Sequence, residues 1–248
     1  MRHQMRCGPA KPAAVRPAAR SPRVACRFSR EEQLKFISHL DIIRTIERAI
    51  RRAAVPVAYT QGHNPRAKLS FASALGIGVT SEAELMVIEL DHILPPDEVK
   101  QRVNEQVPAG LEVIEAWAVP AYRGRYRLGD IDTAEYEMEV AGPIPEFVED
   151  SAGQLIASPT YVITRETDKT SKQVDLRSLV SRVEVVEHGP DHAVVRATAR
   201  TGSQGGARPD EILQALGIDL DRCQVSIHRT ALRASGSARA PAGTDKDR

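Results

Sequence analysis

Apolar residues recur at helical spacing along residues 39–53 and form one stripe of Ile42, Ile43, Ile46, Ala49, Ile50 and Ala53. Ser38, followed three residues later by Asp41, predicts that this helix begins at residue 39. Strands are predicted at 24–30 and 34–38, 55–60, 84–90 and 110–119, and a second helix at 95–107. The first half therefore has the order β-α-β-β-α-β, which is typical of the ferredoxin-like fold.

A second series of elements follows residues 121–131, whose composition is typical of a linker. Helices are predicted at 143–157 and 208–218, a short helical or turn insertion at 171–180, and strands at 134–141, 160–166, 182–188, 192–200 and 222–230. We predict an α+β fold of two ferredoxin-like units in tandem, with a disordered basic N-terminal tail. The expected divisions are 1–23 (tail), 24–120 (first unit), 121–131 (linker), 132–232 (second unit) and 233–248 (disordered tail).

Charge is distributed unevenly along this chain of 248 residues, although the formal net charge is only +1. Residues 1–23 hold six Lys or Arg and no acid, residues 24–72 hold nine Lys or Arg against four acids, and residues 73–229 carry an excess of acids. An acidic body repels polyanions, so any nucleic-acid contact is expected from the tail and from 24–72. No apolar run reaches the roughly 20 residues of a membrane helix, and no signal-peptide core follows the tail, so we expect a cytoplasmic protein without membrane contact.

The three cysteines, Cys7, Cys26 and Cys223, have no paired spacing. Neither C-x-x-C nor the C-x-x-x-C-x-x-C of radical S-adenosylmethionine (SAM) enzymes occurs, so we predict no metal site, no iron–sulfur cluster and no cofactor. The sequence also contains no nucleophile elbow and no P-loop.

Two stretches are candidate binding surfaces for phosphate groups. Arg44, Arg48 and Arg51 share the helix face opposite the apolar stripe, at a spacing that suits successive phosphates. The turn after the helix adds an aromatic ring and three further polar or basic side chains, namely Tyr59, His63, Arg66 and Lys68. An ordinary solvated helix followed by a surface turn is the alternative for both stretches.

His39 and His63 are the candidate catalytic residues. His39 begins the helix, where the dipole disfavours an imidazolium, so a neutral base or a half-buried structural histidine both fit. The glycine-rich segment 201–211 leads into a helix, and with Arg208 it forms either an anion-binding loop or a flexible connection.

Three blocks of this chain resemble the radical-SAM-linked protein family of unknown function, namely FISHLDIIR (36–44), YTQGHNPRAKLSFA (59–72) and GVTSEAE (78–84). The resemblance extends over about 24–232, and the late GSQGGARPDEIL segment matches less tightly. His63 departs from the family's usual large aromatic. The resemblance implies a domain fused to, or encoded beside, a B12-binding radical SAM protein.

The preferred hypothesis is a non-catalytic accessory module that binds a substrate, such as structured RNA, for a radical SAM partner. One alternative is a stand-alone RNA-processing or RNA-modifying enzyme that uses His39 or His63 as general base. The other is an adaptor in a protein complex. We expect the chain to have no catalytic activity of its own, and a cleft that gathers the basic residues would distinguish the first two hypotheses from the third.

Overall fold

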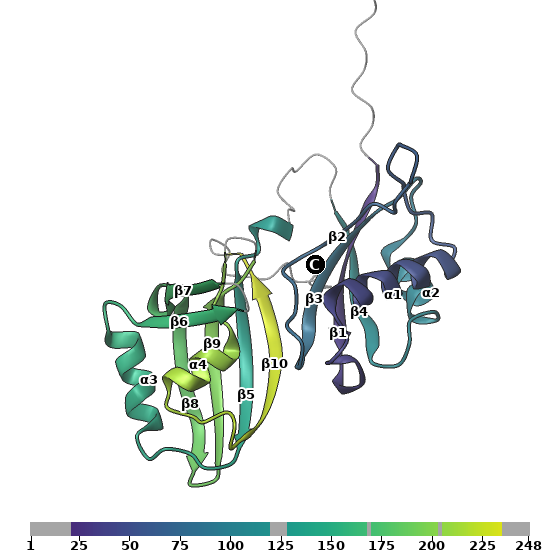
Figure 1. Ribbon diagram of the computed structural model, residues 1–248. Coiled ribbons are helices and arrows are strands. Elements are labelled where there is room, and N and C mark those ends of the chain that lie inside the picture. Colours follow the sequence, from purple (N-terminus) through teal and green to yellow (C-terminus); the bar gives the residue numbers. More distant parts are fainter. Residues whose placement is uncertain (1–20, 120–127, 168–169, 203–204, 235–248) are drawn as a thin grey trace, which may run out of the picture.

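A computed structural model describes residues 21–119, 128–167, 170–202 and 205–234 (Figure 1). The first half of the chain contains β1 (Arg23–Arg30), α1 (His39–Arg52), β2 (Leu69–Phe71), β3 (Val79–Glu89), α2 (Pro96–Asn104) and β4 (Leu111–Val119). The second half contains β5 (Thr133–Ala141), α3 (Val148–Ala157), β6 (Val162–Thr167), β7 (Thr170–Asp175), β8 (Val180–Gly189), β9 (His192–Arg200), α4 (Pro209–Ala215) and β10 (Gln224–Arg233). The mixed α/β class agrees with the sequence prediction. The predicted tails and linker lie largely outside the described residues.

One eight-stranded sheet joins the two halves. Its order is β4-β1-β3-β10-β5-β9-β8, and β2 pairs with the far part of β3. The pairing of β3 with β10 is parallel and short, from Val79 opposite Ile227 to Ser81 opposite Arg229. Strand β3 therefore receives β10 at its beginning and β2 near its end, so it is the structural link between the halves.

The apolar run of β3 is buried on both faces. Met86 and Ile88 lie in one core with Ile42, Ile46 and Ile50 of α1, whereas Leu85 and Val87 face the other core, which extends through the second half. This explains why residues 85–88 are continuously apolar instead of alternating. The predicted stripe of α1 packs on the sheet, although Ile43 is only half-buried.

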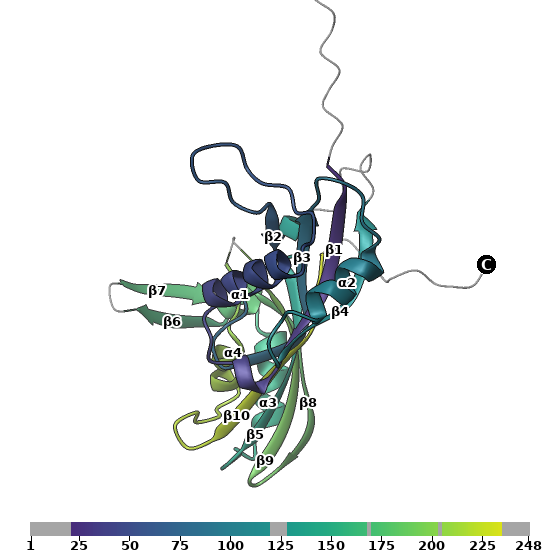
Figure 2. The same cartoon turned by 90° about the vertical axis from the view of Figure 1, so that its right-hand side faces the viewer.

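The helices lie over the sheet in two pairs. Figures 1 and 2 show α1 and α2 side by side on the first half, and both helices contribute to the same core. In the second half α3 packs against β8 and contacts α4. The β6–β7 hairpin forms a separate small sheet that projects from this half (Figure 2). No helix in the described part of the chain is long and apolar enough to cross a membrane.

The predicted strand at 34–38 is wrong. After β1 the chain forms a 3-10 helix at Glu32–Leu34 and a turn. Arg30 causes this bend, because its guanidinium donates to the carbonyl oxygens of Leu34 (3.0 Å), Ile37 (3.0 Å) and Lys35. Segment 34–38 thus wraps around one buried cation and cannot extend the sheet.

Two further predictions need correction. Residues 55–60 form isolated bridges, from Val57 to Leu90 and from Tyr59 to Ala67, and no continuous strand. The predicted helical or turn insertion at 171–180 contains β7 followed by a short 3-10 helix at Leu176–Ser178. In both places backbone pairing with another segment decides the outcome, with Leu90 and Ala67 for 55–60 and with the preceding strand β6 for β7, and the propensity of the segment alone does not reveal it.

Ser38 caps α1 as predicted, since its side chain accepts a hydrogen bond from the backbone N–H of Asp41 at 3.2 Å. We expect Ser38→Ala to lower the free energy of unfolding by about 1 kcal/mol, because an orphan helix N–H loses its acceptor. Ser38→Thr keeps the acceptor and serves as the control in urea denaturation. Equal stability of the alanine and threonine variants would contradict this role.

Candidate functional site

The arginines of α1 form an open cationic face. Arg44, Arg48 and Arg51 are exposed and follow one another at one-turn spacing. Arg44 pairs with Asp41 of the same helix at 3.0 Å, and Arg48 donates to Thr45 at 3.1 Å. Arg51 has no ion pair within the described residues. These guanidinium groups therefore remain at the surface, where the contacts they make are weak enough to be exchanged for phosphate contacts.

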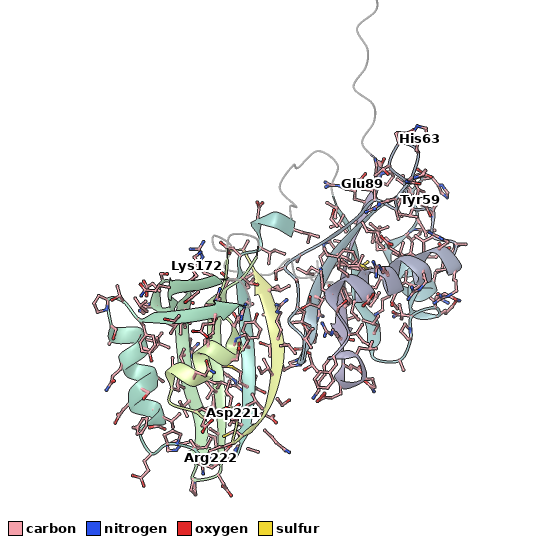
Figure 3. The ribbon with its side chains drawn as sticks, viewed as in Figure 1. Tyr59, His63, Glu89, Lys172, Asp221 and Arg222 are labelled. Atoms are coloured by element: carbon pink, nitrogen blue, oxygen red, sulfur yellow. The ribbon has the colours of Figure 1, made fainter. Side chains whose placement is uncertain are left out.

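The loop after α1 is closed by the bridge between Tyr59 and Ala67. Two hydrogen bonds join Thr60 and Arg66 across it, one from the Thr60 N–H to the Arg66 carbonyl and one from the Arg66 N–H to the Thr60 hydroxyl. His63 lies at the exposed tip, and Tyr59 is half-exposed at the base (Figure 3). Lys68 pairs with Glu89 at 3.3 Å, so this cation is partly neutralised.

His39 is half-buried at the start of α1, and its ring packs edge-on against Phe71. Burial lowers the pKa of His39, Glu84 opposes this, and the charges of Arg30 and Arg229 add to the lowering. A neutral imidazole agrees with the expectation from the sequence, although desolvation is the main cause in the structure. No contact joins His39 to His63 within the described residues, so they form no catalytic pair.

Because the folded state binds the proton of His39 less tightly than the unfolded chain, we expect this residue to reduce stability as the pH falls below about 6.5. An NMR titration of the His39 ring, assigned with the variant His39→Asn, should give a midpoint below the ordinary imidazole value. A midpoint above that value would show that the burial seen here does not govern this group.

Arg208 lies at the junction of the two halves, where it lines a pocket together with Arg229. It precedes α4, and its backbone N–H donates to Glu211 at 3.0 Å. Glu211 is itself held by Arg165, whose Nε and Nη2 reach its two oxygens at 2.6 Å each. The Arg208 side chain approaches Glu211 only to 3.9 Å, so its charge remains available.

The junction also contains a buried group that the sequence did not reveal. Arg229 of β10 donates to Glu84 of β3 at 3.0 Å and to the hydroxyl of Tyr136 of β5 at 3.2 Å. Arg30 and Arg229 are each 2% exposed and Glu84 is 5% exposed. The available signal was the presence of charged residues inside the predicted strands 24–30, 84–90 and 222–230, since charges are rarely buried without partners.

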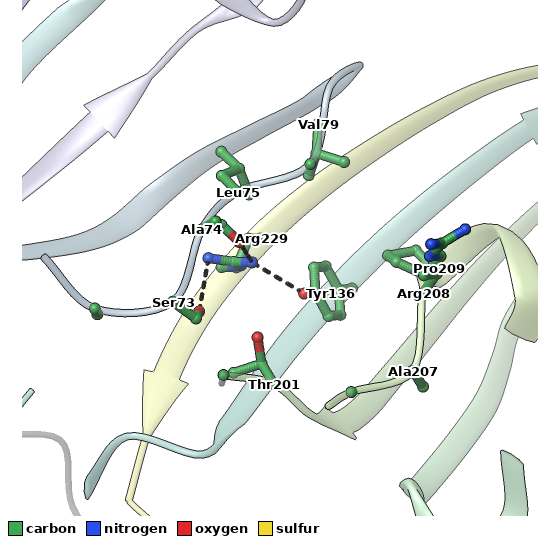
Figure 4. Close-up of a pocket in the computed structure, with 14 residues that line it drawn as sticks. Ser73, Ala74, Leu75, Val79, Tyr136, Thr201, Ala207, Arg208, Pro209 and Arg229 are labelled. Atoms are coloured by element: carbon green, nitrogen blue, oxygen red, sulfur yellow. Dashed lines mark hydrogen bonds between the residues drawn. The ribbon is translucent and has the colours of Figure 1, made fainter. Parts of the chain in front are cut away.

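A pocket of about 470 Å³ opens beside this group (Figure 4). It brings together residues 72–76 and 79, Tyr136, the segment 201–202 and 206–209, and Arg229. Residues of the glycine-rich segment and Arg208 line this cavity, whereas the α1 arginines and the 59–68 loop lie outside it. Within the described residues no group of three or more His, Cys, Asp or Glu is arranged to hold a metal ion.

A model of one protein family, described as an uncharacterized protein conserved in bacteria, matches residues 23–209. No curated protein is significantly similar to the chain in sequence.

Among solved structures, one of an H/ACA ribonucleoprotein bound to a substrate RNA containing 2′-deoxyuridine has a TM-score of 0.43 and 12% identity, over 84% of this chain and 46% of that chain. A Cbf5-Nop10-Gar1 complex has a TM-score of 0.44 and 10% identity, over 84% of this chain and 48% of that chain. An archaeal box H/ACA Nop10-Cbf5 complex has a TM-score of 0.40 and 11% identity, over 86% of this chain and 49% of that chain. The chain therefore spans about half the length of the chains it matches, and likeness at this level carries no conclusion about activity.

Proposed function

Because the chain belongs to DUF2344, a family of uncharacterized proteins conserved in bacteria, its family supplies no activity, and we propose one from its surface. The protein is a non-catalytic module that binds structured RNA for a separate partner enzyme. The observation that carries this proposal is the exposed row of Arg44, Arg48 and Arg51, whose side-chain hydrogen bonds within the described residues reach only neighbours on the same helix.

The row suits a phosphate backbone because guanidinium groups bind phosphate oxygens through two donors at once, without reading sequence. Tyr59 and Arg66, in the loop that follows α1, supply a ring on which a base stacks and a further cation. Local charge supports this assignment, because residues 24–72 hold nine basic and four acidic residues within a chain whose remaining body is acidic.

A salt titration of binding to total cellular RNA tests the proposal. For three to five phosphate contacts we expect a slope of log affinity against log salt of very roughly −2 to −4. Arg44→Ala combined with Arg48→Ala should weaken binding and flatten the slope by about 2. Arg182→Ala combined with Arg222→Ala removes two exposed arginines of the second half and serves as the matched control.

A third variant lacks residues 1–20, so that β1 and the bond between Pro22 and Leu90 are kept, and it separates the effect of the basic tail from that of the helix face. It should bind RNA more weakly but keep any preference among RNAs. If deletion of the tail abolished RNA binding while the variant with Arg44→Ala and Arg48→Ala bound like wild type, α1 would not be an RNA surface.

We propose that the partner is a B12-binding radical SAM protein. The support is the resemblance of residues 36–44, 59–72 and 78–84 to the radical-SAM-linked family. Cys26 is buried, and burial raises its pKa to about 12, so it is a core residue with little thiolate. Affinity purification of the tagged chain from its native cells, followed by mass spectrometry and RNA sequencing, should recover such an enzyme together with RNA. Recovery of RNA without any radical SAM protein would contradict the partnership.

We also propose that the fold consists of two ferredoxin-like units that share one sheet. The order of the first four strands is β4-β1-β3-β2, and the second half repeats this order as β10-β5-β9-β8 if the β6–β7 hairpin is an insertion. The units correspond to 24–120 and 132–232, with 121–131 between them.

An adaptor role is the second candidate, and one surface feature favours it. Four large apolar side chains are exposed around the start of α1, namely Phe36 (71%), Ile37 (39%), Leu40 (63%) and Ile77 (66%). A hydrogen bond from the Gly78 N–H to the Lys35 carbonyl brings the two segments together. Exposed apolar clusters commonly mark protein contacts. If Phe36→Ser with Leu40→Ser abolished partner capture, and wild type bound no RNA, the adaptor role would be the whole function.

A further inference from the structure

The junction of the two halves contains an excess of buried positive charge. Arg30 and Arg229 are both almost inaccessible, and among the described residues Glu84 is the carboxylate whose charge acts on both. Arg30 donates hydrogen bonds to three backbone carbonyl groups, which are uncharged and do not neutralise its positive charge. Arginine does not lose its proton in proteins, and a buried charge without a counter-charge is costly. The two guanidinium groups with one carboxylate therefore favour a further anion nearby.

Arg229 lines the junction pocket, and its two Nη atoms donate to Ser73, Glu84, Tyr136 and the carbonyl oxygen of Ala74. The Nε atom of Arg229 is buried and has no hydrogen-bond partner among the described residues. Ser73 and Tyr136 each accept a hydrogen bond from Arg229, at 3.4 and 3.2 Å. A hydroxyl that accepts from a cation keeps its own proton free to donate. Figure 4 shows both hydroxyls beside the guanidinium, with the Thr201 hydroxyl close by.

The walls of the pocket suit an anion with an organic part. Two of its lining residues are arginines, Arg229 and Arg208, and none of the described lining residues is acidic. Leu75, Val79 and the Tyr136 ring supply apolar surface. The volume of about 470 Å³ falls within the range of roughly 300–1,000 Å³ that is usual for small-molecule sites.

We propose that this pocket binds a nucleoside monophosphate group, with the phosphate at Arg229, Ser73 and Thr201 and the nucleoside against the apolar wall. Arg208 lies at the exposed side of the site. Its positive charge is available to the phosphate because Glu211 is bonded closely to Arg165 and only distantly to Arg208. A phosphate monoester supplies the negative charge that the buried arginines favour, and it can accept hydrogen bonds from the hydroxyls of Ser73, Tyr136 and Thr201. The group is either a free nucleotide or the phosphorylated end of an RNA chain, since both present the same chemistry.

Isothermal titration of the full chain with AMP and with adenosine tests this inference. We expect AMP to bind and to raise the melting temperature, and adenosine to do neither. Arg208→Gln, an exposed position that is safe for folding, should weaken AMP binding about tenfold, and so should Ser73→Ala. Arg182→Gln is the control and should bind AMP like wild type.

An 8-nucleotide RNA with and without a 5′-phosphate identifies the source of the group. Displacement of AMP by the phosphorylated RNA alone assigns an RNA end, whereas displacement by neither RNA assigns a free nucleotide, and both results support the site. Equal binding of adenosine and AMP, or unchanged AMP affinity in Arg208→Gln and Ser73→Ala, would overturn it. The inference goes beyond the RNA-binding role of α1 and is independent of it, because the α1 arginines lie outside the pocket.

Discussion

Replacing Glu84 by alanine is expected to lower the free energy of unfolding by about 3–5 kcal/mol, the usual cost of removing one partner from a buried ion pair. Glu84 is 5% exposed and Arg229 is 2% exposed, and their side chains meet at 3.0 Å. The variant leaves Arg229 and Arg30 without a carboxylate at the junction. Urea denaturation followed by far-ultraviolet circular dichroism measures the loss.

The neighbouring Glu82 provides a matched control for Glu84. It belongs to the same strand but is exposed, and its backbone carbonyl, which accepts from Arg27, is unaffected by the substitution. We expect Glu82→Ala to change stability by no more than about 0.5 kcal/mol. A loss below about 1 kcal/mol in Glu84→Ala would mean that the buried arginines have another counter-charge, and the interpretation of the junction would then be wrong.

Removal of Glu211 is expected to have the second-largest effect. Both of its oxygens accept from Arg165 at 2.6 Å, which holds the pKa of Arg165 above its ordinary value, and one also accepts from the Arg208 N–H. Because Arg165 is still 20% exposed, we expect Glu211→Ala to cost about 2–3 kcal/mol, less than a fully buried pair. The β6–β7 hairpin, which carries Arg165, should also become more susceptible to proteolysis.

Asp210→Ala removes the same charge from the adjacent position of α4 and is the matched control for Glu211→Ala. It should cost less than about 1 kcal/mol, because Asp210 affects Arg165 only through its charge. Equal losses for the two variants would show that helix-terminal charge, and not the bond to Arg165, holds the hairpin.

Helix caps and apolar periodicity predicted those helices and strands whose formation depends mainly on local sequence. Ser38 and the isoleucine stripe placed α1 within one residue of its observed end, and the strands predicted at 182–188 and 192–200 are found as the β8–β9 hairpin. The strand predicted at 34–38 was wrong because the Arg30 side chain bonds to the backbone carbonyl groups of this segment and folds the segment around itself. Apolar periodicity does not report such a contact between a side chain and the backbone.

The candidate site was only partly accessible from the sequence. The α1 arginines were identifiable because helical spacing alone places them on one face. Glu84 and Arg229 come from different halves, and only the short parallel pairing of β3 with β10 brings them together. Their charges interrupt apolar strand patterns, yet without knowledge of that pairing the partner of each was not predictable.

Ultraviolet cross-linking of the protein to cellular RNA, with the cross-linked peptides identified by mass spectrometry, tests the central claim most directly. The account predicts that the dominant cross-links fall in residues 39–68, with Tyr59 among them because its half-exposed ring is available for base stacking. Their yield should drop in Arg44→Ala combined with Arg48→Ala. Cross-links confined to the second half, or to residues 1–23 alone, would contradict the assignment of α1 and its following loop as the RNA surface.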